Sequence, residues 1–254
     1  MNLKIKLTIY VFFVIFFLFC QKKEEVDGTI YFSDKASVLN SDFVRKKNEY
    51  LKSLKQADNI DIRVLVIPST GQFTIEDFSL AAFEQYKIGG DLNNGIFVLI
   101  ATEDKKLRIA TGTGIELIVP DDFASQIIKE MIVYLPRNDL ENAVNVAINR
   151  LHEKAKSVPW TTESKNIEKI TSDDLNKIFE IKGEYISKRK TLESFAVKYR
   201  TDYFANVKVK NKNVLVFENQ YLKNMIKLEK SRKATMLVRL ISLEPETYQL
   251  LNIK

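Results

Sequence analysis

The spacing of apolar residues in the first 155 positions predicts an alternation of helices and strands. One helix face is formed by Phe43, Val44, Tyr50, Leu51 and Leu54. This spacing predicts a helix over about 41–57. The segment DIRVLVIP, residues 61–68, is apolar and β-branched for most of its length, which is typical of a strand covered on both faces. A second helix, over about 74–87, is predicted by a Thr-x-x-Asp start at Thr74 and an apolar stripe after it.

The next part of the chain predicts two strands joined by a turn and then two more helices. The stretches GIFVLIAT and KLRIATG have the pattern of strands on either side of a turn at 103–106. A helix is predicted to begin with Asp121 or Asp122 as its cap and to end near Tyr134. Asp139 is predicted to cap another helix that continues through Leu151.

The order of these elements predicts where two glycine-containing turns lie. If the strands at 61–67 and 96–101 are parallel, the helix between them returns the chain to the edge where the first strand began. The GGDLNNG loop therefore lies at that edge, and the descending strand brings GTGIE to the same edge. We expect the following residues to converge there: Asp91, Asn93, Asn94, Gly112, Gly114, Glu116, Asp121 and Asp122.

Carboxylates and carbonyl oxygens on loops suit Ca²⁺ and, less often, Mg²⁺. Gly95, Gly112 and Gly114 would permit close approach of the backbone at this rim. The same residues also have an ordinary structural interpretation, because Asp, Asn and Gly are common in helix caps and turns. No EF-hand loop, Walker A loop or dinucleotide fingerprint is present in the sequence.

Composition and charge indicate how the chain divides into domains. The 254 residues, 45% of them apolar, are enough to form one large domain or two small ones. Residues 28–155 carry 15 Lys and Arg against 18 Asp and Glu, whereas residues 156–254 carry 20 against 12. This asymmetry predicts two modules, with a linker at 156–166 that contains Pro, Trp and a polar cluster.

The N-terminus has the pattern of an export signal. Lys4 and Lys6 precede 13 apolar or nearly apolar residues, Leu7 to Phe19, and Cys20 follows. This run is shorter than the roughly 20 residues that a spanning helix needs. It resembles a bacterial lipoprotein signal at 1–20, which implies acylation of Cys20 and a polar tether at 21–27. Phe19 stands where a lipobox usually has a small residue, so an uncleaved anchor is the alternative. Either version predicts an exported protein anchored to the membrane of the cell envelope.

The sequence contains few residues for thiol or histidine chemistry. The only cysteine is Cys20, which excludes an intrachain disulfide and a tetrahedral thiolate metal site. The only histidine, His152, lies in a helical pattern without a nucleophile motif nearby, so we interpret it as a structural helix residue.

Residues 28–155 resemble the TPM domain family of thylakoid-lumen and bacterial envelope proteins. The resemblance rests on SDKASVLNSD, on IDIRVLVIPSTGQFTIEDF and on the run from YKIGGDLNNG to GTGIELIVPDD. It implies an α/β three-layer sandwich, with a central mixed sheet between helices on both faces, and a bound divalent cation, often calcium. By matching position, the implied acidic ligands are Asp34, Asp91 and Asp121, with Asp122 as a further candidate. Thr113 departs from the family pattern, which usually has an aromatic residue between the two glycines.

The C-terminal module, residues 167–254, predicts a small α+β fold of unknown type. Helical patterns occupy 167–181 and 185–198, a hairpin is predicted around 210–213, and ATMLVRLISLE is a further strand. The net charge of +8 over residues 156–254 points to acidic headgroups, lipopolysaccharide or an acidic partner rather than nucleic acid, since no RNA-recognition signature is present. A solvated lysine-rich surface is the plain alternative.

Two functions of different classes follow from these observations. The first is a non-catalytic envelope module in which a cation stiffens the acidic rim, and which has the role in assembly or maintenance of membrane protein complexes that the family resemblance implies. The resemblance also implies, from a plant member, a weak metal-dependent acid phosphatase acting on phosphomonoesters. The first is favoured, because the rim has no evident nucleophile apart from its carboxylates and Thr111 or Thr113, and no arginine close in sequence.

Overall fold

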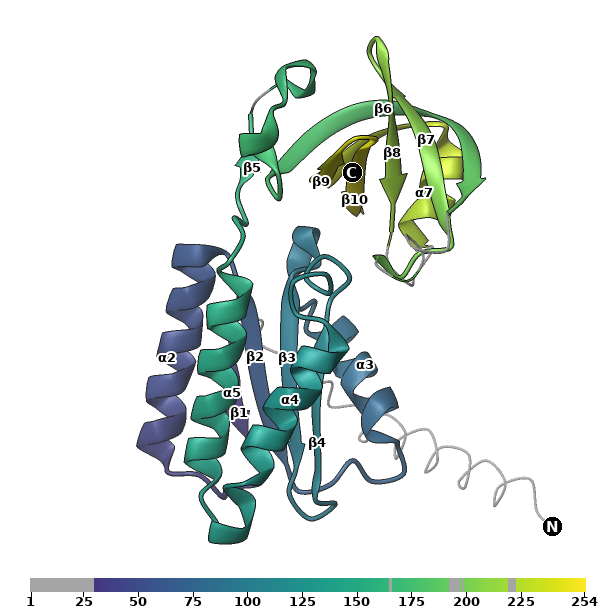
Figure 1. The fold of residues 1–254 in the computed structure, drawn as a ribbon. Coiled ribbons are helices and arrows are strands. Elements are labelled where there is room, and N and C mark those ends of the chain that lie inside the picture. The colour runs from purple at the N-terminus through teal and green to yellow at the C-terminus, as the bar shows by residue number, and fades with distance from the viewer. Residues whose placement is uncertain (1–29, 165, 192–196, 198, 219–222) are drawn as a thin grey trace, which may run out of the picture.

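The computed structural model describes residues 30–164, 166–191, 197, 199–218 and 223–254. They form an N-terminal α/β unit and a C-terminal β unit stacked end to end (Figure 1). The expected signal, the tether and Cys20 lie outside the described residues. Within the described residues, no helix combines the length and apolar character needed to cross a membrane.

The N-terminal sheet is mixed, as the family resemblance implied. Its strands are β1 (Phe32–Asp34), β2 (Asp61–Ile67), β3 (Gly95–Ala101) and β4 (Lys106–Thr111). They lie in this order, with β1, β2 and β3 parallel and β4 antiparallel to β3. The sequence did not reveal β1, because a strand of three residues is too short for a periodic pattern.

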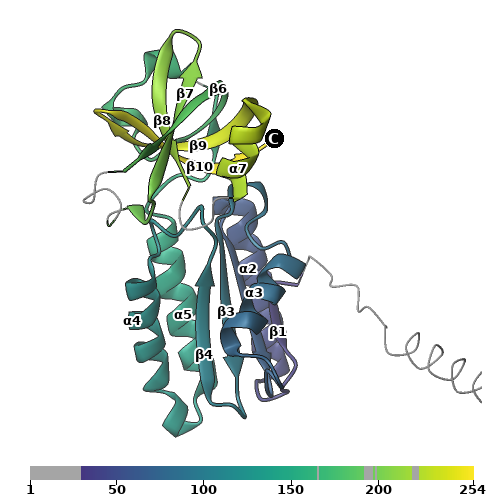
Figure 2. The same cartoon turned by 90° about the vertical axis from the view of Figure 1, so that its right-hand side faces the viewer.

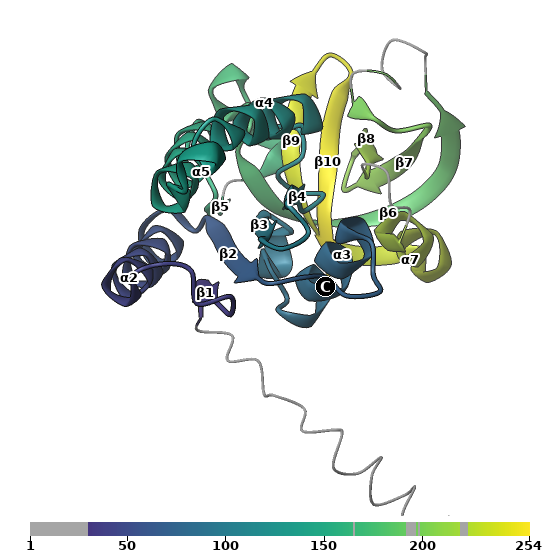
Figure 3. The ribbon, with the colours of Figure 1, turned by 90° about the horizontal axis from the view of Figure 1, so that it is seen from below.

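Helices cover both faces of this sheet and make three layers (Figures 2 and 3). They are α2 (Ser41–Asp58), α3 (Ile75–Gln85), α4 (Asp121–Ile132) and α5 (Leu140–Ala155). Alternate residues of β2 point to opposite faces, so Val64 packs in the core with α2, α4 and α5, and Leu65 packs in the core with α3. The predicted strands and helices of this half are therefore confirmed with small shifts at their ends.

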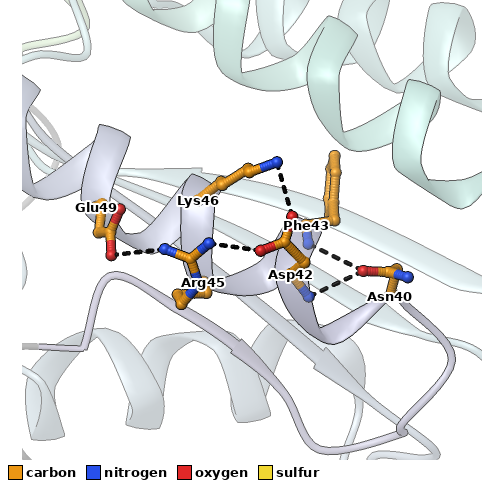
Figure 4. Close-up of polar contacts among 6 residues, drawn as sticks. All are labelled: Asn40, Asp42, Phe43, Arg45, Lys46 and Glu49. Atoms are coloured by element: carbon orange, nitrogen blue, oxygen red, sulfur yellow. Dashed lines mark hydrogen bonds and ion pairs between the residues drawn. The ribbon is translucent and has the colours of Figure 1, made fainter.

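Side chains cap three of these helices. Asn40 Oδ1 accepts the N–H groups of Asp42 and Phe43 at the start of α2, where Asp42 also pairs with Arg45 and Lys46 (Figure 4). Thr74 and Asp139 cap α3 and α5, as the sequence predicted. The predicted cap of α4 is wrong, because the cap position is Pro120 and both aspartates lie within the first helical turn.

The C-terminal unit is a barrel-like sheet with one described helix. Its strands are β5 (Thr162–Glu163), β6 (Ile178–Lys190), β7 (Tyr203–Val209), β8 (Lys212–Phe217), β9 (Lys233–Leu243) and β10 (Glu246–Ile253), and its helix is α7 (Lys223–Ser231). The strand order is β5-β6-β7-β8-β10-β9, and a further pairing of β6 with β9 closes the ring. Four short 3-10 segments are also described: Gly90–Leu92 and Leu135–Arg137 in the first unit, and Ile167–Lys169 and Ser172–Asp174 before β6.

The expected helix at 167–181 is wrong, and so is the expected helical start at 185–190. Residues 178–190 form the long strand β6, in which Phe179 and Ile181 are buried whereas Glu180 and Lys182 are exposed. This is the two-residue period of a strand, and it outweighs the local helical propensity of the lysines and glutamates. The hairpin around 210–213 and the strand that includes Ala234 are confirmed.

The connection between the units is buried in part. Trp160, within the expected linker, is 2% exposed and donates its indole N–H to the carbonyl of Ala155. The same apolar core also takes in Ile178, Leu237 and Leu251 from the C-terminal unit. The core of the N-terminal unit thus extends into the C-terminal unit, which also has a core of its own, and this shared part fixes the C-terminal unit against the N-terminal sheet.

Candidate functional site

Both glycine turns lie at one edge of the N-terminal sheet, by which we mean the end of the sheet where β2 and β3 begin and β4 finishes. Asp61 pairs with Gly95 at the start of two parallel strands, and Thr111 pairs with Ile96 at the end of the antiparallel strand. The loop before Gly95 and the turn after Thr111 therefore meet at this edge. We call residues 89–94, 112–116 and 121–122 the rim.

The two turns contact each other through their backbones. The N–H of Gly112 donates to the carbonyl of Gly95 over 2.8 Å, and the N–H of Gly114 donates to the carbonyl of Asn93 over 2.9 Å. A Cβ atom at Gly114 would lie 2.0 Å from the carbonyl oxygen of Leu92, so a larger residue would push the turns apart. Close packing of the turns is sufficient to explain why glycine occupies these positions.

An arginine from the C-terminal unit joins two rim carboxylates. Arg200 Nη1 lies 2.7 Å from Glu116 Oε1 and 2.9 Å from Asp121 Oδ2. The Glu116 side chain is 8% exposed, whereas that of Asp121 is 67% exposed, so the contact runs from the interior to the surface. Arg200 has a left-handed backbone, φ 49°, which is uncommon for a non-glycine residue and indicates that the tertiary contacts fix its position.

The protonation of these groups is coupled. Burial raises the pKa of Glu116 above its usual value, and the hydrogen bond and charge of Arg200 offset only part of this effect. The contacts with Glu116 and Asp121 raise the pKa of Arg200, which keeps its guanidinium charged. Arg200 therefore supplies the positive charge that allows Glu116 to ionise at a buried position.

The last strand of the chain binds the loop that carries Asp91. Asn93 Nδ2 donates to the carbonyl of Leu251 over 2.5 Å, and Asn252 Nδ2 lies 3.4 Å from Asp91 Oδ1. Gln249 Nε2 donates to the carbonyl of Thr113 in the facing turn over 2.8 Å. Strand β10 thus covers both turns and connects to each of them.

A second arginine, Arg239, is buried where the C-terminal unit meets the rim. Arg239 is fully buried, its guanidinium carbon lies 4.1 Å from the centre of the Trp160 ring, and Nη1 donates to the carbonyl of Gly114 over 3.1 Å. Burial lowers the pKa of Arg239 to about 9, so the group remains charged at neutral pH. The Trp160 ring face and the Gly114 carbonyl stabilise this charge.

Sequence reasoning missed these arginines because they lie far from the rim along the chain. It also missed Asp61, which is 2% exposed, pairs with Arg63 at 3.0 Å and accepts the N–H of Gly89 over 2.9 Å. The one available signal for Asp61 was a carboxylate at the start of an otherwise apolar strand. Asp61 holds the base of the glycine loop, which is a structural role.

The four predicted metal ligands do not form one group. Asp34 lies at the opposite edge of the sheet, paired with Val66, and its carboxylate accepts the N–H groups of Ala36, Val38 and Leu39. This is a correction to the implied ligand set, and it follows from β1 running parallel to β2 toward that edge. No cluster of three or more His, Cys, Asp or Glu residues suited to a metal ion occurs in the described part of the chain.

The remaining rim carboxylates fit a cation site poorly in this arrangement. Asp121 is already bound to Arg200, Asp91 lies beside the amide of Asn252, and Asp122 is exposed in the first turn of α4. The guanidinium of Arg200 thus takes the place next to the carboxylates where we expected Ca²⁺. The negative charge of Glu116 and Asp121 is balanced from within the chain.

His152 has the structural role that the sequence indicated. Its Nε2 lies 2.9 Å from Asp58 Oδ2, and its ring meets the Tyr50 ring edge to face. These contacts join α5 to α2.

Comparison with known proteins gives one family match. Residues 32–154 match the family model described as the TPM domain. A search of curated proteins found no match to the chain.

Three solved structures are similar to part of this chain. The N-terminal domain of a P. gingivalis protein is 23% identical, with a TM-score of 0.48, over 52% of this chain and 85% of its own. Protein BA42 of Bizionia argentinensis is 20% identical, with a TM-score of 0.42, over 53% of this chain and 90% of its own. The N-terminal domain of the cg2496 protein of Corynebacterium glutamicum is 13% identical, with a TM-score of 0.42, over 57% of this chain and 93% of its own.

Proposed function

Because residues 32–154 form a TPM domain, we propose that this is a membrane-anchored cell-envelope protein that acts as a non-catalytic interaction module. In this role it supports the assembly or maintenance of membrane protein complexes. The C-terminal unit holds the acidic rim in a fixed, charge-balanced state, and the surfaces around it serve as contacts for other proteins.

The observation that carries this proposal is the position of Arg200. A metal-dependent phosphatase needs carboxylates free to hold the metal and positive charge free to bind phosphate. Here one guanidinium binds Glu116 and Asp121 at 2.7 and 2.9 Å, so the carboxylates and the cation satisfy each other. Strand β10 also covers the turns from which a phosphate would receive backbone N–H groups.

Binding of Ca²⁺ at the rim remains a prediction, and the ion would compete with Arg200 for the carboxylates. The ion would have to displace Arg200 before Glu116 and Asp121 could become ligands. We therefore expect weak Ca²⁺ binding in the native chain and stronger binding in Arg200→Ala, where the two carboxylates lose their counter-charge. Mg²⁺ is expected to bind less well, because it demands near-ideal octahedral geometry.

A combined titration and activity assay tests the proposal. The chain without residues 1–20, and its Arg200→Ala variant, would be titrated with CaCl₂ while their melting temperatures are followed, and then assayed with p-nitrophenyl phosphate. We expect no phosphatase activity from either protein and a Ca²⁺-dependent rise in melting temperature mainly in Arg200→Ala. Activity of the native chain that disappears in Asp121→Ala would contradict the non-catalytic role and favour the phosphatase alternative.

The anchor and the basic face are proposed as the parts that hold the protein at the membrane. Five lysines line one open hollow of the C-terminal unit: Lys182, Lys208, Lys210, Lys233 and Lys254. Their charge suits anionic headgroups or an acidic partner, and it offers no base-reading motif for nucleic acid. Labelling cells with a fatty-acid analogue tests the anchor, since Cys20→Ser should abolish incorporation if Cys20 is acylated.

A further inference from the structure

A cavity lies at the edge of the N-terminal sheet opposite the rim. It has a volume of about 560 Å³, within the range of about 300–1,000 Å³ typical of small-molecule sites. The ends of β3 and the start of β4 form its floor, with Ile100, Ala101 and Leu107, and the α4–α5 connection forms a wall with Ile132, Leu135 and Leu140.

The position of the cavity in the fold favours ligand binding. In open α/β sheets, ligands bind outside the carboxyl ends of the parallel strands, and Ile100 and Ala101 lie at that end of β3. The other edge is covered by the C-terminal unit (Figure 1). The cavity is therefore at the edge of the TPM domain that this cover leaves accessible.

The chemistry of the lining selects a class of ligand. Most of the lining residues are apolar, and Val38 and Ile132 are 53% and 49% exposed, which leaves apolar surface in contact with water. Lys105, in the β3–β4 turn, and Lys106, the first residue of β4, also line it. Among the residues that the structure describes, neither lysine has a carboxylate within 4.0 Å, although the charge of Lys106 acts on Asp104 at longer range. An apolar hollow beside two such ammonium groups complements an amphiphile with an anionic head.

The surrounding loops hold this hollow open by hydrogen bonds that do not use the lysines. Asp34, at the end of β1, accepts the N–H groups of Val38 and Leu39 and so fixes the loop that carries the Val38 side chain. Asp139 is occupied as the cap of α5, where it accepts the N–H of Asn142. Asp104, next to Lys105 in sequence, is bonded to Ser69 and Thr70.

We propose that this cavity binds a free single-chain amphiphile with an anionic head, whose apolar chain lies against Ile100, Leu107 and Ile132 and whose head pairs with Lys105 and Lys106. The proposal does not depend on the function of the rim. The proposed occupant is a separate molecule in solution, and the test below distinguishes it from a bilayer surface.

The test uses laurate as the probe and the chain without residues 1–20. Laurate below its critical micelle concentration would be titrated into the ¹⁵N-labelled protein, with dodecanol as the uncharged analogue. We expect saturable shifts of amides around 100–107 and 132–140, and about tenfold weaker binding of dodecanol. Ile132→Trp, which fills the cavity from a half-exposed position, should abolish saturation, and the double variant Lys105→Glu/Lys106→Glu should weaken binding about tenfold or more.

Matched controls make the result decisive. Lys52→Glu reverses a charge on the exposed face of α2, away from the cavity, and should bind laurate as the native chain does. Melting curves of all variants show whether they are folded. Absence of saturable laurate binding, or equal binding by Ile132→Trp and the native chain, would overturn the proposal. So would a loss of co-sedimentation with anionic vesicles in these variants while laurate binding is unchanged, because the ligand would then be the bilayer.

Discussion

The guanidinium of Arg200 lies 2.7 Å from the carboxylate of Glu116, a residue 84 positions earlier in the chain. This single contact joins the C-terminal unit to the turn that follows β4 in the TPM domain. It also decides the charge state of the rim, because the buried carboxylate is balanced by an arginine of the same chain. The acidic rim is therefore an internal interface of this protein.

Removal of Arg200 should destabilise the protein. Arg200→Ala leaves Glu116 buried without its counter-charge, and we expect a loss of about 1–2 kcal/mol in the free energy of unfolding. This is less than the loss for a fully buried pair, because the Arg200 side chain is 36% exposed. Urea unfolding followed by Trp160 fluorescence measures the change. In the double variant Arg200→Ala/Glu116→Gln the loss should be smaller than the sum of the two single losses; strict additivity would mean that the pair is not coupled.

The loss of folding stability in Arg200→Ala should depend on pH. Burial raises the pKa of Glu116 in the folded state, so the folded protein binds this proton more tightly than the unfolded chain does. The stability associated with protonated Glu116 is fully present below the unfolded pKa and is lost as pH rises through the folded pKa. Without Arg200 the folded pKa rises further. We therefore expect Arg200→Ala to lose more stability at pH 7 than at pH values below the usual range of Glu, as measured by melting temperature. An equal loss at both pH values would contradict this coupling.

Substitution of Gly114 should separate the two turns. In Gly114→Ala the new Cβ would meet the carbonyl oxygen of Leu92 at 2.0 Å, and a backbone atom cannot move aside without shifting the loop. We expect a loss of about 2–4 kcal/mol, in the range of strained core substitutions. Gly90→Ala is the control: its Cβ has nothing within 4 Å, so it should lose only about 1 kcal/mol from the left-handed backbone. Equal melting temperatures for the two variants would argue against close contact of the turns.

The single tryptophan should report the docking of the two units. Trp160 is 2% exposed and stacks under the guanidinium of Arg239. In Arg239→Ala the ring loses this cover, and we expect its emission to move to longer wavelength with a loss of about 2 kcal/mol in stability. Lys233→Ala, an exposed change at the start of the same strand, should leave the emission unchanged. An unaltered spectrum in Arg239→Ala would contradict the stacked arrangement.

The local pattern of apolar and polar residues was sufficient to predict most of the helices and strands of the N-terminal unit. Strand β2 was predicted at 61–68 and found at Asp61–Ile67, because a β-branched run ended by proline has few alternative structures. Strand β6 was mistaken for helices because lysine and glutamate favour helices locally, whereas pairing with β7 and β9 on either side decides its conformation. The three-residue strand β1 gave no periodic signal at all.

The candidate site was predictable only in part. Chain direction placed both glycine turns at one edge, since a right-handed crossover returns each parallel strand to the same side. It could not place Asp34, which required knowledge of β1, and it could not reveal Arg200 or Arg239. These two residues reach the rim by the closure of a barrel whose strands pair over long sequence separations.

The sequence by itself determined the order of strands and helices from α2 onward in the TPM domain, the edge at which its turns meet and the need for glycine within them. These features follow from local periodicity and from the fixed handedness of strand connections. Only the tertiary structure decided that the rim is covered and that its carboxylates are bound by Arg200. Docking of the second unit depends on the combined burial of many apolar side chains, and no short segment contains that information.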